Sequence, residues 1–257
     1  MFRQVYRFVR DQLGLDPVRT YRALRSLPRY WSSLRLFRQG YDGILVYQPC
    51  LTDWYERGDA ACGEYFLQDL VVAQQVLAAN PRVHLDVGSR VDGFVAHIAA
   101  TRSIEVIDIR PMRSPHSNIT MHQADLLGLP DRWHDYCDSV SCLHALEHMG
   151  LGRYGDPVSP RGHEAALRKL ASVLCPGGVL YLSLPVGRPR VHFNAHRVVD
   201  PKALVGLAES IGLRVLRISS ITNGPDGAVH GESDVKTLSA MDYALGMFVF
   251  RKEVQCT

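Results

Sequence analysis

The segment Val83-His84-Leu85-Asp86-Val87-Gly88-Ser89-Arg90-Val91-Asp92-Gly93 decides how this chain is expected to fold. An apolar run ends at an acidic residue and a glycine, and residues 94–100 then read as a helix. This order of strand, tight loop and helix is typical of the first βα turn of a nucleotide-binding sheet. Gly88 can adopt a positive φ in such a loop and lets a ligand approach the backbone closely.

The glycine spacing of this loop limits the kind of nucleotide that it can hold. The dinucleotide fingerprint G-x-G-x-x-G needs three glycines, whereas this loop has only Gly88 and Gly93. Nicotinamide and flavin dinucleotides are therefore not expected. The acidic residue before the glycine, Asp86, suits a ligand that presents an amine or hydroxyl groups.

Further acidic residues end the predicted strands downstream. Asp108 closes the strand 104–108 and lies 20 residues beyond Gly88, the distance at which nucleotide-binding folds place a carboxylate for the ribose hydroxyls. Asp125 ends a strand over 119–125. Two more strands are expected over 136–143 and 174–185, and the second of them opens with a Pro-Gly-Gly turn.

These features, in this order, resemble class I S-adenosylmethionine-dependent methyltransferases, whose first motif Asp86 and Gly88 match. Arg90 and Asp92 stand where later glycines of that motif are expected. The resemblance covers about residues 80–251. It implies an α/β fold over 41–257, with a doubly wound, mostly parallel seven-stranded sheet whose last strand is antiparallel. It also implies S-adenosylmethionine as the cofactor, bound by Asp86, Gly88, Ser89, Asp108, Asp125, Leu126 and His144.

The string His144-Ala145-Leu146-Glu147-His148 follows the fourth predicted strand directly. It fits the H-x-x-E-H motif of a zinc peptidase, but that motif needs a long helix in a different scaffold. It also resembles the E-x-x-E-H motif of O-methyltransferases that bind a divalent metal, which implies a metal held by His144, Glu147 and His148. Alternatively, His148 acts as a general base without a metal. A third alternative is that Glu147 and His148 only close the floor of the cofactor site.

Other polar residues are expected to surround an acceptor. The glycine-rich loop 150–157 carries Arg153, Tyr154 and Asp156, which suit a polar small molecule such as a sugar. His196 follows the fifth strand and is predicted to be a further base or ligand. Residues 222–240 are expected to form a loop that binds the acceptor or closes over it. Helix 64–79 is either a lid that uses Tyr65, Gln68 and Asp69 or an ordinary packing helix.

Residues 1–40 are predicted to form a basic, amphipathic helical arm that Pro17 and Pro28 divide. Residues 1–38 hold nine arginines and two acidic residues, so they carry +7, and the remaining chain carries −4 of the overall +3. The arm is expected either to contact an anionic membrane surface or an acidic partner, or to pack on the main domain with its arginines in water. No motif that reads nucleic acid accompanies these arginines.

The favoured function is methyl transfer from S-adenosylmethionine to a hydroxyl group of a sugar or glycan. Leu143–Pro157 and Phe193–Val198 are similar to an uncharacterised branch of this fold found among surface-glycan biosynthesis proteins. Two alternatives stay open: a non-catalytic partner in glycan assembly and a membrane-peripheral scaffold. Six cysteines without a C-x-x-C pair and no apolar run of about 18 residues favour a cytoplasmic protein with reduced thiols, peripheral to a membrane if the arm binds one.

Overall fold

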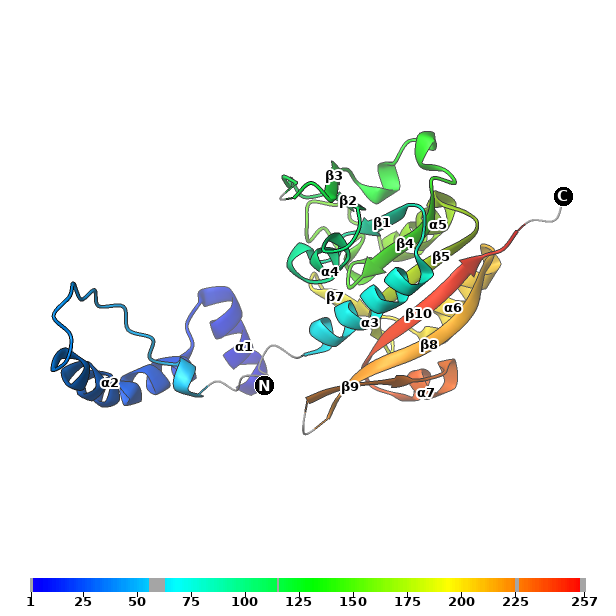
Figure 1. Ribbon diagram of the computed structural model, residues 1–257. Helices are drawn as coiled ribbons and strands as arrows, with labels where there is room; N and C mark the ends of the chain where they lie inside the picture. Colours follow the sequence, from blue (N-terminus) through cyan, green and yellow to red (C-terminus); the bar gives the residue numbers. More distant parts are fainter. Residues whose placement is uncertain (1, 56–62, 115, 225–226, 255–257) are drawn as a thin grey trace. The chain divides into compact units, whose positions relative to one another are not determined.

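The computed structural model describes residues 2–55, 63–114, 116–224 and 227–254 (Figure 1). The chain forms two compact units, residues 1–61 and 62–257. Of the six cysteines, Cys50, Cys137, Cys142 and Cys175 are free thiols, and Cys62 and Cys256 lie outside the described residues. Among the described residues, no helix is both long and apolar enough to cross a membrane.

The first unit consists of two helices, α1 (Phe2–Leu13) and α2 (Pro17–Arg38), and a short 3-10 turn at Asp53–Tyr55. Asp16 begins α2, because its side chain accepts the backbone N–H of Arg19 at 3.0 Å. The predicted break at Pro28 is wrong, since α2 continues through it. Pro28 removes one backbone hydrogen bond of the helix. Arg22 and Arg29, on either side of Pro28, lie over the rings of Tyr55 and Trp54, and these contacts with residues outside the helix stabilise α2 there.

The second unit is an α/β domain around one large sheet. Its strands lie in the order β3-β2-β1-β4-β5-β10-β8-β9. The first five are parallel, and β10 is antiparallel to both β5 and β8. The bounds are β1 His84–Val87, β2 Ile104–Asp108, β3 Ile119–Gln123, β4 Cys137–Leu143, β5 Leu174–Val186, β8 Leu213–Gly224, β9 Gly227–Glu232 and β10 Ala244–Lys252, with β6 Arg190–His192 and β7 His196–Val198 in a separate hairpin.

Helices cover both faces of this sheet, as a doubly wound fold requires (Figure 1). One hydrophobic cluster joins α3 and α4 to the sheet, and the other joins α5, α6 and α7 to the opposite face. The bounds of these helices are α3 Glu64–Ala79, α4 Ala96–Ala99, α5 Gly162–Val173, α6 Pro201–Ser210 and α7 Val235–Ala240. The predicted doubly wound, mostly parallel α/β fold with a helical N-terminal part is therefore confirmed.

Over the residues that the structure describes, the sheet has eight strands rather than the seven predicted. The additional strand is β9, which pairs antiparallel with β8 along the edge of the sheet. It lies in the segment 222–240, which was predicted to be a loop and which also contains α7. The prediction was wrong because the glycines and Asn223 of this segment read as loop signals, whereas Gly224 and Gly227 end the two paired strands. Asp226 lies outside the described residues.

The helix after the first loop begins with one turn of π-helix at Val91–Val95 and continues into α4. A Cβ at Gly93 would lie 2.1 Å from Oδ2 of Asp69, so any larger residue there would displace this carboxylate. Asp69 in turn accepts the backbone N–H of Phe94. The carboxylate of α3 thus supports the start of the helix that follows the glycine loop.

Candidate functional site

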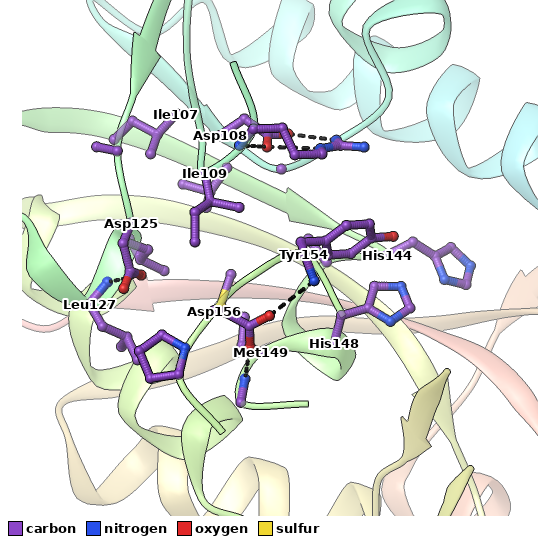
Figure 2. A pocket seen from close by; sticks show the side chains of 18 residues that line it. Ile107, Asp108, Ile109, Asp125, Leu127, His144, His148, Met149, Tyr154 and Asp156 are labelled. Carbon is purple, nitrogen blue, oxygen red and sulfur yellow. Dashed lines mark hydrogen bonds and ion pairs between the residues drawn. The ribbon is translucent and has the colours of Figure 1, made fainter. Parts of the chain in front are cut away.

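A hollow of about 730 Å³, its open mouth included, lies beyond the carboxyl ends of β1, β2, β3 and β4 (Figure 2). This is the edge of a doubly wound sheet where ligands bind. Of the residues predicted to bind a cofactor, Gly88, Asp108, Asp125, Leu126 and His144 line the hollow. His148, predicted to be catalytic, also lines it. The strand ends therefore bring together residues that are up to 60 positions apart in the chain.

The floor of the hollow at β1 is bare backbone. Gly88 has φ +71°, and its N–H donates to the carbonyl oxygen of Ile107 at 3.0 Å. A Cβ at this position would lie 3.0 Å from Cβ of Ala145, in a conformation that residues with side chains rarely adopt. The loop therefore leaves room for a ligand to approach the main chain, as its sequence predicts.

Asp86 and Ser89 lie behind this loop rather than in the lining. Asp86 is fully buried and accepts Oγ–H of Ser89 at 2.6 Å, N–H of Ser89 at 3.0 Å and Oγ–H of Ser141 at 2.5 Å. Ser89 Oγ also accepts the backbone N–H of Leu143 at 3.2 Å. Burial raises the pKa of Asp86 to about 6. The two residues therefore tie β1 to β4 and hold the shape of the loop.

Asp108 stands at the end of β2 with its carboxylate already paired. Arg110, two residues on, donates from Nε to Oδ1 at 2.9 Å and from Nη2 to Oδ2 at 2.6 Å. The backbone N–H of Arg110 also donates to Oδ1 at 2.8 Å. This bidentate pair is short and oriented, and a ribose diol bound here would exchange for part of it. Sequence reasoning missed Arg110, although its position two residues after the predicted ribose carboxylate was available as a signal.

Asp125 and Leu126 form the wall at the end of β3. Asp125 accepts the backbone N–H of Leu127 at 3.0 Å and so begins a short 3-10 turn, Leu126–Gly128. Leu126 is buried, and Ile109, the residue after β2, lines the same hollow, as does Met149 from the loop after β4. Apolar side chains and one carboxylate thus surround a space suited to an aromatic base.

His144 and Glu147 form a buried pair immediately after β4. Nδ1 of His144 lies 2.8 Å from Oε1 of Glu147, and the exposed fractions of the two side chains are 7% and 1%. The His144 ring lies against the ring of Tyr65 at 4.3 Å between centroids, and its backbone has φ +54°. Nε2 of His144 and Oε2 of Glu147 are buried and have no hydrogen-bond partner among the described residues.

The predicted metal set does not form in this structure. Within the described residues, no group of three or more histidine, cysteine, aspartate or glutamate side chains is arranged to hold a metal ion. The lone pairs of a metal set must converge on one point. Instead, Oε1 of Glu147 lies between Nδ1 of His144 and Nε2 of His148, at 2.8 and 3.8 Å. The residues His144, Glu147 and His148 therefore do not fit the metal that the sequence resemblance implies.

His148 has the geometry of a neutral imidazole with one free nitrogen. Nδ1 donates to the carbonyl oxygen of Ala195 at 2.6 Å, so the proton is on Nδ1 and Nε2 carries a lone pair. The same carbonyl oxygen accepts Nη1–H of Arg153 at 2.9 Å. Burial lowers the pKa of His148, and the Arg153 guanidinium lowers it further, while Glu147 acts in the opposite direction. His148 is thus uncharged at neutral pH and able to accept a proton.

The glycine-rich loop 150–157 forms the outer wall. The Asp156 carboxylate accepts the backbone N–H groups of Gly150, Gly152 and Tyr154 at 2.7, 3.2 and 3.2 Å. Figure 2 shows the bond from Tyr154. Although burial alone would raise it, these three donors lower the pKa of Asp156. Asp156 therefore shapes the loop, whereas it was predicted to hold the acceptor.

Tyr154 presents its ring at the mouth of the hollow. The guanidinium groups of Arg110 and Arg153 each lie 5.1 Å from the centre of this ring. The ring of His148 meets it edge-on at 5.7 Å. The Tyr154 ring thus connects the Asp108–Arg110 end of the hollow with the imidazole of His148.

Arg197 and His196, which follow the fifth parallel strand, have other places. Arg197 is buried and donates to the carbonyl oxygens of Glu147, Met149, Ser159 and Pro160, which makes it a clamp at the base of the loop. His196, predicted to be catalytic, packs against the ring of His192 at 4.8 Å and does not line the hollow. Of the predicted lid residues, Gln68 and Asp69 are buried, and only Tyr65 reaches the site.

Comparison with known proteins supports the fold. The family model described as a Caenorhabditis protein of unknown function, DUF268, matches residues 103–209, from β2 to α6. None of the curated proteins compared with the chain matches it. A Burkholderia thailandensis 1,6-didemethyltoxoflavin-N1-methyltransferase, solved with S-adenosylhomocysteine, is similar in structure at 15% identity, covers 83% of this chain and 94% of its own, and gives a TM-score of 0.50.

The [4+2]-cyclase SpnF is similar at 16% identity, covers 84% of this chain and 86% of its own, and gives a TM-score of 0.51. The methyltransferase-like fold that the sequence predicts is therefore confirmed. One of these two relatives is a methyltransferase and the other a cyclase, so the reaction has to be argued from the site itself.

Proposed function

We propose that this chain binds S-adenosylmethionine and transfers its methyl group to a hydroxyl group of a small-molecule acceptor, most simply a sugar or glycan hydroxyl. One observation carries the proposal. A single hollow runs from the carboxylates of Asp108 and Asp125, past the bare backbone of Gly88, to the free Nε2 of His148. Adenosine binding and proton acceptance are thereby combined in one space.

The residues of the hollow fit the parts of the cofactor. Asp108 suits the ribose hydroxyls, and Asp125 with Leu126 suits the adenine ring. The Gly88 backbone leaves room for the methionine part, and the unpartnered Nε2 of His144 and Oε2 of Glu147 mark polar atoms that a ligand can satisfy. When bound, S-adenosylmethionine supplies a methyl group on a positively charged sulfur.

The chain's own residues then have few tasks. The strand ends and the loop 150–157 hold donor and acceptor in line, which provides much of the acceleration of a displacement reaction. His148 accepts the hydroxyl proton at Nε2, and the carbonyl oxygen of Ala195 keeps the proton of Nδ1 in place. A neutral amine acceptor needs no such base, so the imidazole favours a hydroxyl.

The mouth of the hollow favours a polar acceptor with an extended surface. Tyr154, 39% exposed, lines the hollow, and Tyr65, 42% exposed, lies against His144 beside it. The Arg153 guanidinium lies beside them and has no carboxylate partner among the described residues. Aromatic faces next to hydrogen-bond donors suit the alternating apolar and hydroxyl surfaces of a sugar.

Calorimetric titration with S-adenosylmethionine and S-adenosylhomocysteine tests the cofactor step. We expect binding with a Kd well below about 1 mM, the value that corresponds to about −4 kcal/mol. Transfer of an isotopically labelled methyl group to a panel of sugars and glycans then tests the acceptor. Labelled product from amines but not from hydroxylated compounds would refute the hydroxyl assignment and leave the cofactor assignment intact.

A second candidate is a non-catalytic partner in glycan assembly that has the fold without the cofactor. It is favoured by the closed Asp108–Arg110 pair and by Arg90 and Asp92, which pair with each other at 2.9 Å in the place of loop glycines. The absence of any binding at millimolar S-adenosylmethionine and S-adenosylhomocysteine would favour this candidate over methyl transfer.

A further inference from the structure

The N-terminal unit contains much apolar surface and almost no interior. Of its described side chains, only Ser26 is buried. Large apolar side chains are more than half exposed along α1, α2 and the segment that follows, among them Val5, Phe8, Leu13, Leu24, Trp31 and Leu36. Single exposed apolar residues are ordinary on protein surfaces. A unit whose apolar side chains are mostly exposed indicates a surface that a membrane or another molecule covers.

The first helix separates its apolar and basic residues. Val5, Val9 and Leu13 recur at every fourth position of α1 and so share one face. The periodicity of the sequence keeps the arginines of this segment, Arg10 among them, off that face. An arginine beside an apolar face can lay its stem on that face and extend its charge outward.

The second helix adds charge and aromatic rings. Arg19, Arg25 and Arg35 lie on α2, and their side chains pair with no carboxylate or ring among the described residues. Trp31, Tyr21 and Phe37 are more than half exposed. Tryptophan and tyrosine are the residues that favour the boundary between lipid tails and headgroups.

We propose that the α1–α2 unit lies on the surface of an anionic membrane, with the apolar face of α1 inserted among the lipid headgroups. Charge complementarity selects this occupant. Nine arginines against two acidic residues attract a negatively charged surface, and the exposed apolar and aromatic side chains gain a contact that a folded acidic protein surface does not offer. This inference is independent of the proposed methyl transfer.

Vesicle flotation of the full chain tests the proposal. We expect the protein to float with vesicles that contain phosphatidylglycerol and to stay behind with pure phosphatidylcholine vesicles. Raising the salt concentration should reduce binding, because salt screens the arginines. Absence of flotation with phosphatidylglycerol vesicles, or equal flotation with both kinds of vesicle, would overturn the proposal. The first outcome would leave an acidic protein or the second unit as the partner of the arm.

Two triple variants separate insertion from charge attraction. Val5→Ser/Val9→Ser/Leu13→Ser removes the apolar face of α1, and Arg19→Gln/Arg25→Gln/Arg35→Gln removes unpaired charges of α2. Each should lower the bound fraction by at least about tenfold. The matched controls are Val158→Ser/Leu216→Ser/Val229→Ser and Arg132→Gln/Arg168→Gln/Arg214→Gln in the second unit, which should bind as the unmodified chain does.

Circular dichroism and melting of each variant exclude unfolding as the cause of lost binding. Full binding of the serine variant would overturn the insertion and reduce the contact to charge alone. Loss of binding in the control variants would overturn the assignment to the α1–α2 unit. Cofactor titration of the same samples is expected to be unchanged, so a failure of this inference is distinguishable from a failure of the proposed reaction.

Discussion

Both carboxylate oxygens of Asp108 are engaged by the guanidinium of Arg110, at 2.9 Å from Nε to Oδ1 and 2.6 Å from Nη2 to Oδ2. In the proposed function Asp108 also holds the ribose hydroxyls, so the cofactor and Arg110 would compete for one carboxylate. The affinity of this chain for S-adenosylhomocysteine should therefore depend on both residues in opposite directions.

Asp108→Ala should weaken S-adenosylhomocysteine binding about tenfold to a hundredfold, because hydrogen bonds to a charged group contribute about 1.5–3 kcal/mol. Arg110→Gln should strengthen binding by about threefold to tenfold, because a competing donor is removed from the carboxylate. Titration calorimetry gives both constants. Arg113→Gln, a nearby exposed arginine, is the control and should bind as the unmodified protein does. Weaker binding by Arg110→Gln would mean that the pair positions Asp108 for the ligand.

His148→Ala should lower kcat by about a hundredfold to ten-thousandfold, the usual contribution of a general base, and leave cofactor affinity within about twofold. The rate should fall toward acid pH with a midpoint below 6.5, since burial and then Arg153 lower the pKa of His148 and the protonated ring accepts no proton. Arg153→Gln should move this midpoint upward. Rate-against-pH profiles of the unmodified protein and of Arg153→Gln measure the shift. Identical profiles would show that His148 is not the group whose titration limits the rate.

Arg197→Gln should destabilise the protein by about 3 kcal/mol, because carbonyl oxygens at both ends of the loop 150–157 lose their donor in a buried place. Arg197→Lys should cost less, since an ammonium group keeps part of the hydrogen bonds. Urea unfolding measures the free energies, and amide hydrogen exchange should show faster exchange over residues 149–160. Arg161→Gln, at an exposed position beyond the loop, is the control, and an equal loss there would refute the clamp.

His84 should make the fold sensitive to acid. Its ring contacts Oγ of Ser139 and Ser141 at 2.7 and 3.2 Å, and burial lowers its pKa to about 3. The unfolded chain takes up this proton near pH 6.5, so the stabilisation is complete above that pH and is lost as the pH falls toward 3. Between pH 6.5 and pH 5 the loss is about 2 kcal/mol, at about 1.4 kcal/mol for each pH unit.

Urea unfolding of His84→Gln at pH 7 and pH 5 tests this contribution. The free energy of unfolding of the variant should change with pH by about 2 kcal/mol less than that of the unmodified protein. The exposed His116 provides the comparison, because His116→Gln should keep the full dependence on pH. The same slope in all three proteins would show that another group is responsible.

The succession of parallel strands along the chain was predictable because each of these strands ends in a recognisable local pattern. Gly88, Asp108, Asp125 and His144 follow apolar runs directly, and the fold brings the ends of such runs to one edge of the sheet. Strand β9 was not predictable, since its sequence is rich in glycine and its residues are largely exposed. It is stabilised mainly by its backbone pairing with β8, which the sequence does not reveal.

The roles of buried polar residues could not be read from the sequence. Asp86 looks the same whether it faces a ligand or accepts Oγ–H of Ser141, which comes from a strand 55 residues away. Asp156 and Arg197 look like ligand-binding groups, yet backbone groups of the loop occupy them. A charged side chain on a glycine-rich loop can serve the loop or a ligand, and only the three-dimensional contacts decide between the two.

The Asp156 carboxylate, which gathers three backbone N–H groups, makes the course of the loop independent of the side chains that the loop displays. Tyr154 and Arg153 can consequently be exchanged without rebuilding the wall on which they stand. The backbone of the loop would then keep its course when these two side chains change. Relatives or designed variants with other residues at the two positions would admit different acceptors, while the proposed cofactor-binding residues stay unchanged.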